Sequence, residues 1–198
     1  MSRALSGRPR DGTLDGRVLA ATRKLLLENG FAAMTMDAVA GAAKVPKTTI
    51  YRRWPSKEEL AIAALQAGKP SAAVPDLGDT YAELVRLVLI RLERRFSAES
   101  RLWPRLFDDA AQRPELRRLV WERLVVPRRR QLQAFLQRGI ERGDLRPDLD
   151  LEMTPDLVVG AITAAARTAI FTERLADREG LARTVADGLW RGLSQSRE

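Results

Sequence analysis

The chain has 198 residues and a formal net charge of +8, and it contains neither cysteine nor histidine. Without these residue types it cannot form disulfides, zinc sites built on their side chains, or the Ser-His-Asp and Cys-His arrangements of nucleophilic enzymes. Nucleotide-binding glycine motifs are also missing from the sequence, so we expect no catalytic residue, no metal and no cofactor.

Positive charge is concentrated toward the N-terminus. Residues 1–60 carry eleven Lys and Arg against six Asp and Glu, whereas the remaining residues carry twenty-three against twenty. This distribution suits contact with a phosphate backbone, although a GC-rich genome would also favour arginine and alanine. The chain has no run of eighteen uncharged apolar residues and no signal-peptide pattern. These features predict a cytoplasmic protein that makes no membrane contact.

The beginning of the chain predicts a tail followed by a scaffold helix. Residues 1–12 are polar and contain Arg8 and Arg10. They form either a flexible basic arm of the kind that enters a DNA minor groove or a tail of no defined role. From residue 13 to Asn29 the apolar residues recur at helical spacing, and Gly30 is suited to the left-handed conformation that ends a helix.

The next segment predicts two short helices joined by a tight turn. Thr35 is suited to cap the first of them, and Lys44-Val45 turns the chain. A second helix then opens at Pro46 or Lys47, where proline loses no needed donor, and runs to about Trp54. This order of elements is that of a helix-turn-helix DNA reader.

A third helix follows this pair. Pro55 ends the second helix, and Ser56 caps the next one with Glu59 at the capping-box position. Its apolar residues continue to about Gly68, and residues 70–78 read as a linker rich in glycine, proline and alanine.

The remainder of the chain predicts further helices and no strand. Apolar residues recur at helical spacing, and Pro127 interrupts one segment by removing a backbone donor. The expected helices span 81–96, 100–112, 114–143, 151–171 and 175–193. We therefore predict an all-α fold of about nine helices.

The residues of this helix-turn-helix segment resemble the DNA-binding domain of the TetR family of transcriptional repressors. The matching residues are Gly30-Phe31, Thr35, Val39-Ala40, Ala43, Thr49-Ile50-Tyr51, Trp54 and Ser56-Lys57-Glu58-Glu59-Leu60. The residues that depart from the usual family pattern are Lys44, Pro46, Thr48 and Arg53. The resemblance implies a helix-turn-helix DNA-binding domain over 13–60. It also implies a C-terminal helical domain over 61–198 that binds a small molecule and supplies its last two helices to a dimeric bundle.

The resemblance also implies which residues contact double-stranded DNA. A recognition helix brings short polar and basic side chains to base edges from its first turn, while flanking residues hold phosphates. The base-facing candidates are Lys47, Thr48 and Thr49. The phosphate candidates are Thr35, Tyr51, Arg52, Arg53 and Lys57. Arg8 and Arg10 are DNA candidates only as part of the possible minor-groove arm. A solvated helix surface is the alternative for each residue taken singly.

Large side chains of the C-terminal region are candidates for a ligand pocket, because such pockets lie between helices and are mainly apolar. They are Trp103, Phe107, Trp121, Phe135 and Arg167. Ordinary core packing is the alternative for the aromatic residues. Candidates for a dimer interface lie in the last two helices: Leu157, Ala161, Ala164, Ala165, Leu189 and Trp190.

The leading hypothesis is a homodimeric repressor that binds a pseudo-palindromic operator and releases it when a small-molecule effector binds. One alternative keeps the DNA binding without a ligand, as in an activator or a DNA-organising protein. The other is an enzyme that uses carboxylates such as Asp108-Asp109. Adjacent acids point in different directions on a helix, so the sequence favours a regulator over an enzyme.

Overall fold

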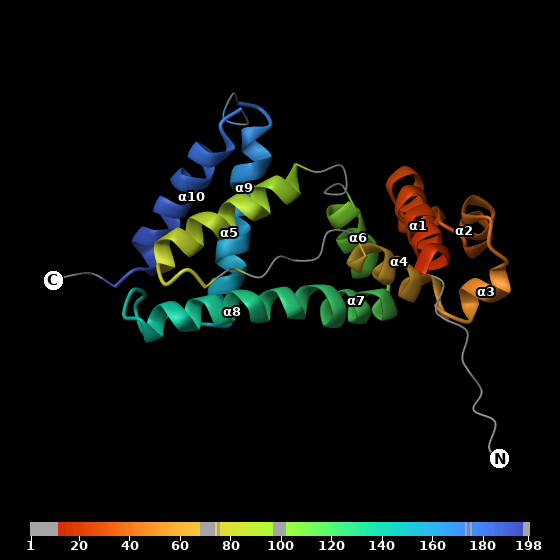
Figure 1. Cartoon of the computed structure of the whole chain (residues 1–198), viewed down its shortest axis with the longest axis horizontal. Helices are drawn as coiled ribbons and strands as arrows, with labels where there is room; N and C mark the ends of the chain where they lie inside the picture. Colours follow the sequence, from red (N-terminus) through yellow and green to blue (C-terminus); the bar gives the residue numbers. More distant parts are fainter. Residues whose placement is uncertain are drawn as a thin grey trace, which may run out of the picture. The chain divides into compact units, whose positions relative to one another are not determined.

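The computed structural model describes residues 12–67, 74, 76–96, 102–172, 174 and 176–195. These residues confirm the all-α prediction (Figure 1). Their one β-type contact is an isolated bridge between Leu145 and Ser194. They form nine helices when α7, η2 and α8 are counted as a single interrupted helix, as the sequence predicts. Within these ranges no helix is long and apolar enough to cross a membrane.

The helices fall into two compact units, which are described separately. The first comprises Met1–Pro70 and Pro104–Val120, and the second comprises Ser71–Trp103 and Trp121–Glu198. The cut between Pro70 and Ser71 falls in the predicted linker over 70–78, which marks the expected boundary between the domains. The helix over 57–66 nevertheless belongs to the first unit and not to the region after residue 60, because α4 (Lys57–Gln66) packs on α1 (Gly12–Ala33), and α7 (Pro114–Val120) packs on α4. An apolar helix face does not identify the helix that it packs against, so the sequence could not reveal these contacts. The functional division into DNA-binding and regulatory domains stays a prediction.

Local capping residues set where the helices of the first unit begin. Besides α1, α4 and α7, this unit contains α2 (Met36–Ala43), α3 (Lys47–Tyr51) and most of α6 (Leu102–Ala111). Thr35 caps α2 as predicted, because its hydroxyl accepts from the Ala38 N–H at 3.1 Å. Ser56 caps α4 in the same way through the Glu59 N–H at 3.1 Å.

Two helix ends differ from their predicted places. At Gly30 the chain takes φ 75° and ψ 174°, so this glycine interrupts α1, but helical structure resumes and continues to Ala33. The recognition helix α3 ends at Tyr51 and not at Trp54. Residues 52–54 form a turn whose N–H groups donate to the carbonyls of residues 48 and 50. Pro55 disfavours helical backbone at the residue before it, which explains the early end.

The second unit is built around α5 (Thr80–Arg95), with α9 (Thr154–Ala169) and α10 (Arg178–Leu193) packed on it (Figure 1). Asp79 and Asp177 cap α5 and α10 by accepting from N–H groups of their first turns. These helices start and end within a few residues of the predicted spans.

The predicted interruption at Pro127 takes the form of a π-helical segment. Residues Trp121–Val125 form η2, which leads into α8 (Val126–Glu141). Proline lacks the N–H that would continue the α-helical ladder, and its ring displaces the carbonyl four residues before it. A wider π turn accommodates such a break in the hydrogen-bond ladder.

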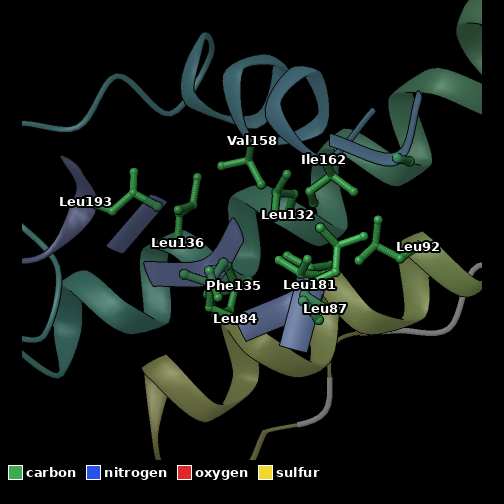
Figure 2. Packing of buried hydrophobic residues seen from close by; sticks show 14 of the residues in the cluster. Leu84, Leu87, Leu92, Leu132, Phe135, Leu136, Val158, Ile162, Leu181 and Leu193 are labelled. Carbon is green, nitrogen blue, oxygen red and sulfur yellow. The ribbon is translucent and has the colours of Figure 1, made fainter. Parts of the chain in front are cut away.

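The core of the second unit draws residues from four helices. Figure 2 shows that their apolar side chains point toward one another from α5, α8, α9 and α10. Among the most buried are Leu84, Leu132, Phe135, Val158 and Ala182, each with 0–1% of its surface exposed. Burying apolar surface at about 25 cal/mol per Å² is the main favourable contribution to this packing.

One buried charge stands beside this core. The Glu83 side chain on α5 is 0% exposed and accepts from Arg142 at 2.8 Å, Arg138 at 3.2 Å and the Leu77 N–H at 2.9 Å. Burial alone would raise the pKa of Glu83, but the hydrogen bonds from Arg142, Leu77 and Arg138 lower it below its ordinary value. Exposed Asp76 adds a second carboxylate to the same two arginines. The network ties α8 to the start of α5.

We predict that Glu83→Gln lowers the free energy of unfolding by about 2–4 kcal/mol near neutral pH, because two partly buried arginines lose their main counter-charge. Since the pKa of Glu83 is lowered in the fold, its stabilisation is present above its unfolded value of about 4.3. It is lost as the pH falls through the lower folded value. Urea unfolding at several pH values measures both effects.

The matched control is Asp76→Asn, which removes an exposed carboxylate from the same network. This change is expected to cost about 1 kcal/mol or less. Equal effects of the two variants, or a Glu83→Gln variant with the pH dependence of the parent, would contradict the assigned role of Glu83.

Candidate nucleic-acid interface

The turn between α2 and α3 is closed by a residue that is not glycine. Lys44 ends α2 in the left-handed conformation, with φ 54° and ψ 50°. This conformation costs a residue with a side chain about 1–2 kcal/mol. Arg17 on α1 supports the turn, because its guanidinium donates to the carbonyls of Ala43 at 2.5 Å and Lys44 at 2.9 Å. A long-range contact thus reinforces a turn that a residue other than glycine closes.

The recognition helix α3 is held in place on its inner side. Ile50 is fully buried, and Val45 in the preceding turn is 5% exposed. Arg53, just beyond the end of α3, forms an ion pair with Asp15 on α1, and both side chains are partly buried. Arg53 is one of the predicted phosphate contacts, and the structure places its guanidinium against α1. Its further role in DNA contact stays untested.

Lys47 lies in the first turn of α3 and faces solvent. Its ammonium group donates to Asp37 Oδ2 at 2.8 Å and lies 5.9 Å from the centre of the Tyr51 ring. The hydrogen bond with Asp37 raises the pKa of Lys47, so the side chain is charged at neutral pH. Because this ion pair is exposed, it contributes little stability. A guanine acceptor or a phosphate could therefore replace Asp37 at small cost.

Lys57, in the first turn of α4, reaches back toward the end of α1. Its ammonium group donates to the Ala32 carbonyl at 3.0 Å and lies 4.5 Å from the centre of the Phe31 ring. Arg113 approaches the same ring at 5.5 Å. Burial lowers the pKa of Lys57. The side chain therefore joins α4 to α1, and any phosphate would contact an ammonium group that is already oriented.

The remaining DNA candidates differ in their exposure. Those with exposed side chains present atoms to solvent on α2, α3 and the following turn, namely Thr35, Lys47, Thr48, Tyr51 and Arg52. Those that are partly buried are Thr49, Arg53 and Lys57. Arg8 and Arg10 lie outside the described residues. The exposed set combines hydroxyl, phenol and cationic groups, which are the donors that DNA phosphates and bases accept.

Sequence reasoning missed three residues that shape this surface: Asp15, Arg17 and Asp37. Asp15 and Arg17 act through partners that lie far along the chain, and nothing in the local pattern of α1 marks them. Asp37 could be read as a favourable charge at a helix start. Its pairing with Lys47 depends on the angle between α2 and α3, which the sequence does not specify.

The candidates for a ligand pocket differ in burial and belong to both units. Phe135 is fully buried in the core of the second unit, and Arg167 on α9 is exposed. Trp121 is 49% exposed, and Trp103 is partly buried, both in the second unit. Phe107 is 47% exposed and belongs to the first unit. A pocket lined by these residues stays a prediction.

An open groove of about 460 Å³ lies in the first unit near the end of α1. Its lining is polar and of mixed charge, and it includes Asp108 and Asp109. Asp109 pairs with Arg113 at 2.8 Å, while Asp108 is exposed. The two acids are thus not a converged, desolvated pair of the kind an enzyme uses. Among the described residues no group of three or more His, Cys, Asp or Glu could hold a metal ion.

The candidates for a dimer interface divide between two helices. On α9, Leu157 is 65% exposed, and Ala161 and Ala164 are exposed on the same face, while Ala165 is partly buried. On α10, both Leu189 and Trp190 are partly buried against the core of their own unit. The Trp190 ring meets the Tyr81 ring edge to face, with centroids 5.4 Å apart.

Two sequence models of a single family match this chain. Residues 18–64 match the model described as bacterial regulatory proteins, tetR family. Residues 74–188 match the model described as the tetracyclin repressor-like C-terminal domain. The two matches together include both the helix-turn-helix segment and most of the second unit.

Individual relatives are similar over most of their length. The uncharacterized HTH-type transcriptional regulator YdeS of Bacillus subtilis is 34% identical over 157 residues, which are 79% of this chain and 79% of that protein. The DNA-binding transcriptional repressor TetR of Mycobacteroides abscessus is 30% identical over 156 residues, which are 78% of this chain and 82% of that protein. The crystal structure of the TetR family transcription regulator SCO0332 is similar at a TM-score of 0.66 and 26% identity, and the match covers 92% and 99% of the two chains.

We predict that Lys47→Ala relaxes the choice of base at one position of the DNA site by about 1–3 kcal/mol. Lys57→Ala is expected to weaken binding to all sequences and to reduce the slope of log affinity against log salt by about one. Titration of a DNA site and its single-base variants at several salt concentrations separates the two effects.

Lys24→Ala is the control, because it removes the same charge from an exposed side chain that pairs with Glu28 on α1. It should leave base discrimination unchanged. An unaltered salt slope in Lys57→Ala would show that this ammonium group serves only the contact between α4 and α1.

Proposed function

We propose that this chain, which belongs to the TetR family of transcriptional regulators, represses transcription by binding a pseudo-palindromic operator as a homodimer. We further propose that a small molecule bound by the second unit releases the operator. The similarity to the Mycobacteroides abscessus repressor supports the choice of repression over activation.

The observation that supports DNA binding is the position of α3: its first turn is exposed to solvent, and its opposite face is buried in the first unit. Lys47 and Thr48 are exposed while Ile50 is buried, so the short helix presents one side to a ligand. A major groove admits an α-helix whose first residues meet base edges. A single module of this kind covers too little surface for a specific operator, which favours two copies about one DNA turn apart.

The apolar residues of α9 and its C-terminal end support the dimer. Leu157 is 65% exposed, Val159 is 37% exposed, and Ile170 and Phe171 beyond them are 61% and 85% exposed. Contiguous exposed apolar patches mark interaction surfaces, and Leu157, the most exposed large apolar side chain within α9, is the centre of the contact proposed here. Ala161 lies one turn after Leu157 on the same face and permits a close approach of a second helix.

Ligand control requires that the effector bind two states of the dimer with different affinity. One state would hold the two recognition helices at the spacing of successive major grooves, and the other would not. An activator or a DNA-organising protein with a dimerising second unit would lack this coupling. The two readings are therefore separated by a measurement of coupling and not by DNA binding alone.

We predict that Leu157→Arg converts the dimer into a monomer, because the change places a charge at the centre of the proposed apolar contact. Operator affinity should fall by about tenfold or more as the second half-site is lost. Light scattering gives the mass and a DNA titration gives the affinity.

Leu77→Arg is the matched control, since Leu77 is 55% exposed in the loop before α5 and is not part of the proposed interface. It should leave mass and affinity as they are. A parent protein that is monomeric and still specific for its operator would overturn the dimer.

We also predict that an effector and the operator change each other's affinity by the same factor, about 5- to 150-fold. A panel of apolar and cationic aromatic compounds can be titrated with and without operator DNA. Intrinsic fluorescence reports binding through Trp103 and Trp121. A compound that binds equally well in both conditions would indicate binding without control.

A further inference from the structure

Three arginines near the C-terminal end of α5 and the start of α8, in the second unit, have partly buried side chains. Arg91 and Arg94 lie on α5, and Arg128 lies near the start of α8. Each is only partly exposed. Their charges act on one another, since Arg94 and Arg91 both disfavour the charged form of Arg128. Like charges that are removed from water repel one another more strongly than they do in solution.

Arg128 has an aromatic partner in place of a carboxylate. Its guanidinium carbon lies 3.8 Å from the centre of the Trp103 ring. Burial, together with the charges of Arg94 and Arg91, lowers the pKa of Arg128 to about 10. The side chain is therefore still charged at neutral pH. Stacking on an indole face leaves the N–H groups at the edge of a guanidinium free to point outward.

Arg91 contains a buried donor without a partner. Its Nε atom is inaccessible to solvent and makes no hydrogen bond. Burial and the charge of Arg94 lower the pKa of Arg91. A buried donor left unsatisfied costs about 1–3 kcal/mol, and more when the group is charged.

The contrast with a second arginine pair in the same unit is informative. Arg138 and Arg142 are also partly buried, and Arg138 Nε likewise makes no hydrogen bond, but Glu83 lies between the two guanidinium groups and accepts from both. No carboxylate within the described ranges forms an ion pair of this kind with Arg91 or Arg128. Buried charges in proteins are paired or bind a ligand, so Arg91 and Arg128 lack the anion that such surroundings favour.

We propose that Arg91, Arg128 and Trp103 form a binding site for a small molecule that carries a carboxylate or phosphate group on an apolar body. The planar guanidinium groups suit bidentate contact with either oxyanion. The indole ring of Trp103 supplies an apolar wall next to the charge. The inference of an anion site depends only on these contacts. The further inference that the anion is the effector rests on the proposed function.

The binding test uses the full-length protein without DNA. Three anions are titrated, namely benzoate, decanoate and inorganic phosphate, and benzamide and decanol serve as uncharged counterparts of the first two. Calorimetry and Trp103 fluorescence report binding. We expect benzoate or decanoate to bind at least about tenfold more tightly than its uncharged counterpart, as hydrogen bonds to charged groups allow. Binding of phosphate alone would identify a site for a free phosphate ion, whereas tighter binding of the organic acids would identify the apolar body as part of the ligand.

Arg91→Gln and Arg128→Gln should each weaken binding of the preferred anion by about tenfold or more. Arg128→Lys keeps the charge without the planar fork and should retain part of the affinity. Arg86→Gln on α5 and Arg130→Gln on α8 are matched controls, because both side chains are exposed on the same two helices. They should bind the anion as the parent does.

Thermal unfolding of the unliganded variants tests whether they are folded as stably as the parent protein. Neither Arg91→Gln nor Arg128→Gln should lower the melting temperature by more than about 2 °C, because neither change removes an ion pair. If no anion binds better than its uncharged counterpart, the site is refuted. If both variants lose stability while anion binding stays at the parent level, the arginines are structural and the proposal is also wrong.

A final titration repeats the anion binding in the presence of operator DNA. If the operator changes the affinity for the anion and the anion changes the affinity for the operator by the same factor, the anion is the effector. An unchanged operator affinity would leave the anion site in place and count against ligand control by this site. Failure of the anion site and failure of the proposed function are thus distinguishable.

Discussion

The direction of the recognition helix depends on contacts that α1 supplies. A helix of five residues forms too few internal hydrogen bonds to be stable by itself. Buried Ile50 attaches α3 to the first unit, and the ion pair between Arg53 and Asp15 fixes the residues that follow it. Arg17 holds the turn that leads into it. The exposed side chains of α3 therefore point in a defined direction only while α1 keeps these contacts.

Burial gives the arginines of this chain different physical roles. An arginine-rich composition is expected from a GC-rich genome and carries little information by itself. Arg138 and Arg142 enclose a buried carboxylate and stabilise the second unit. Arg91 and Arg128 are also partly buried in the second unit. Arg91 has an unpaired Nε donor, and Arg128 stacks on the Trp103 ring. A regulator can accept such a loss of stability where a ligand restores it.

The features that sequence reasoning predicted correctly are those with local causes. Thr35 and Ser56 cap helices because a short hydroxyl side chain reaches an N–H three residues later. Pro127 interrupts a helix because its missing donor lies in its own backbone. The family could be recognised for a related reason, since its motif is a contiguous run of caps, turns and core residues in one order.

By itself the sequence determined the all-α fold, the helix-turn-helix order and the family. Only the tertiary structure decided what Arg53 and Lys57 contact, since their partners Asp15 and Ala32 lie on a helix far along the chain. It also assigned residues 104–120 to the first unit and placed Phe135 in a core. The reason is physical: helical periodicity fixes which face of a helix is apolar, but the packing angles between helices fix which side chains meet.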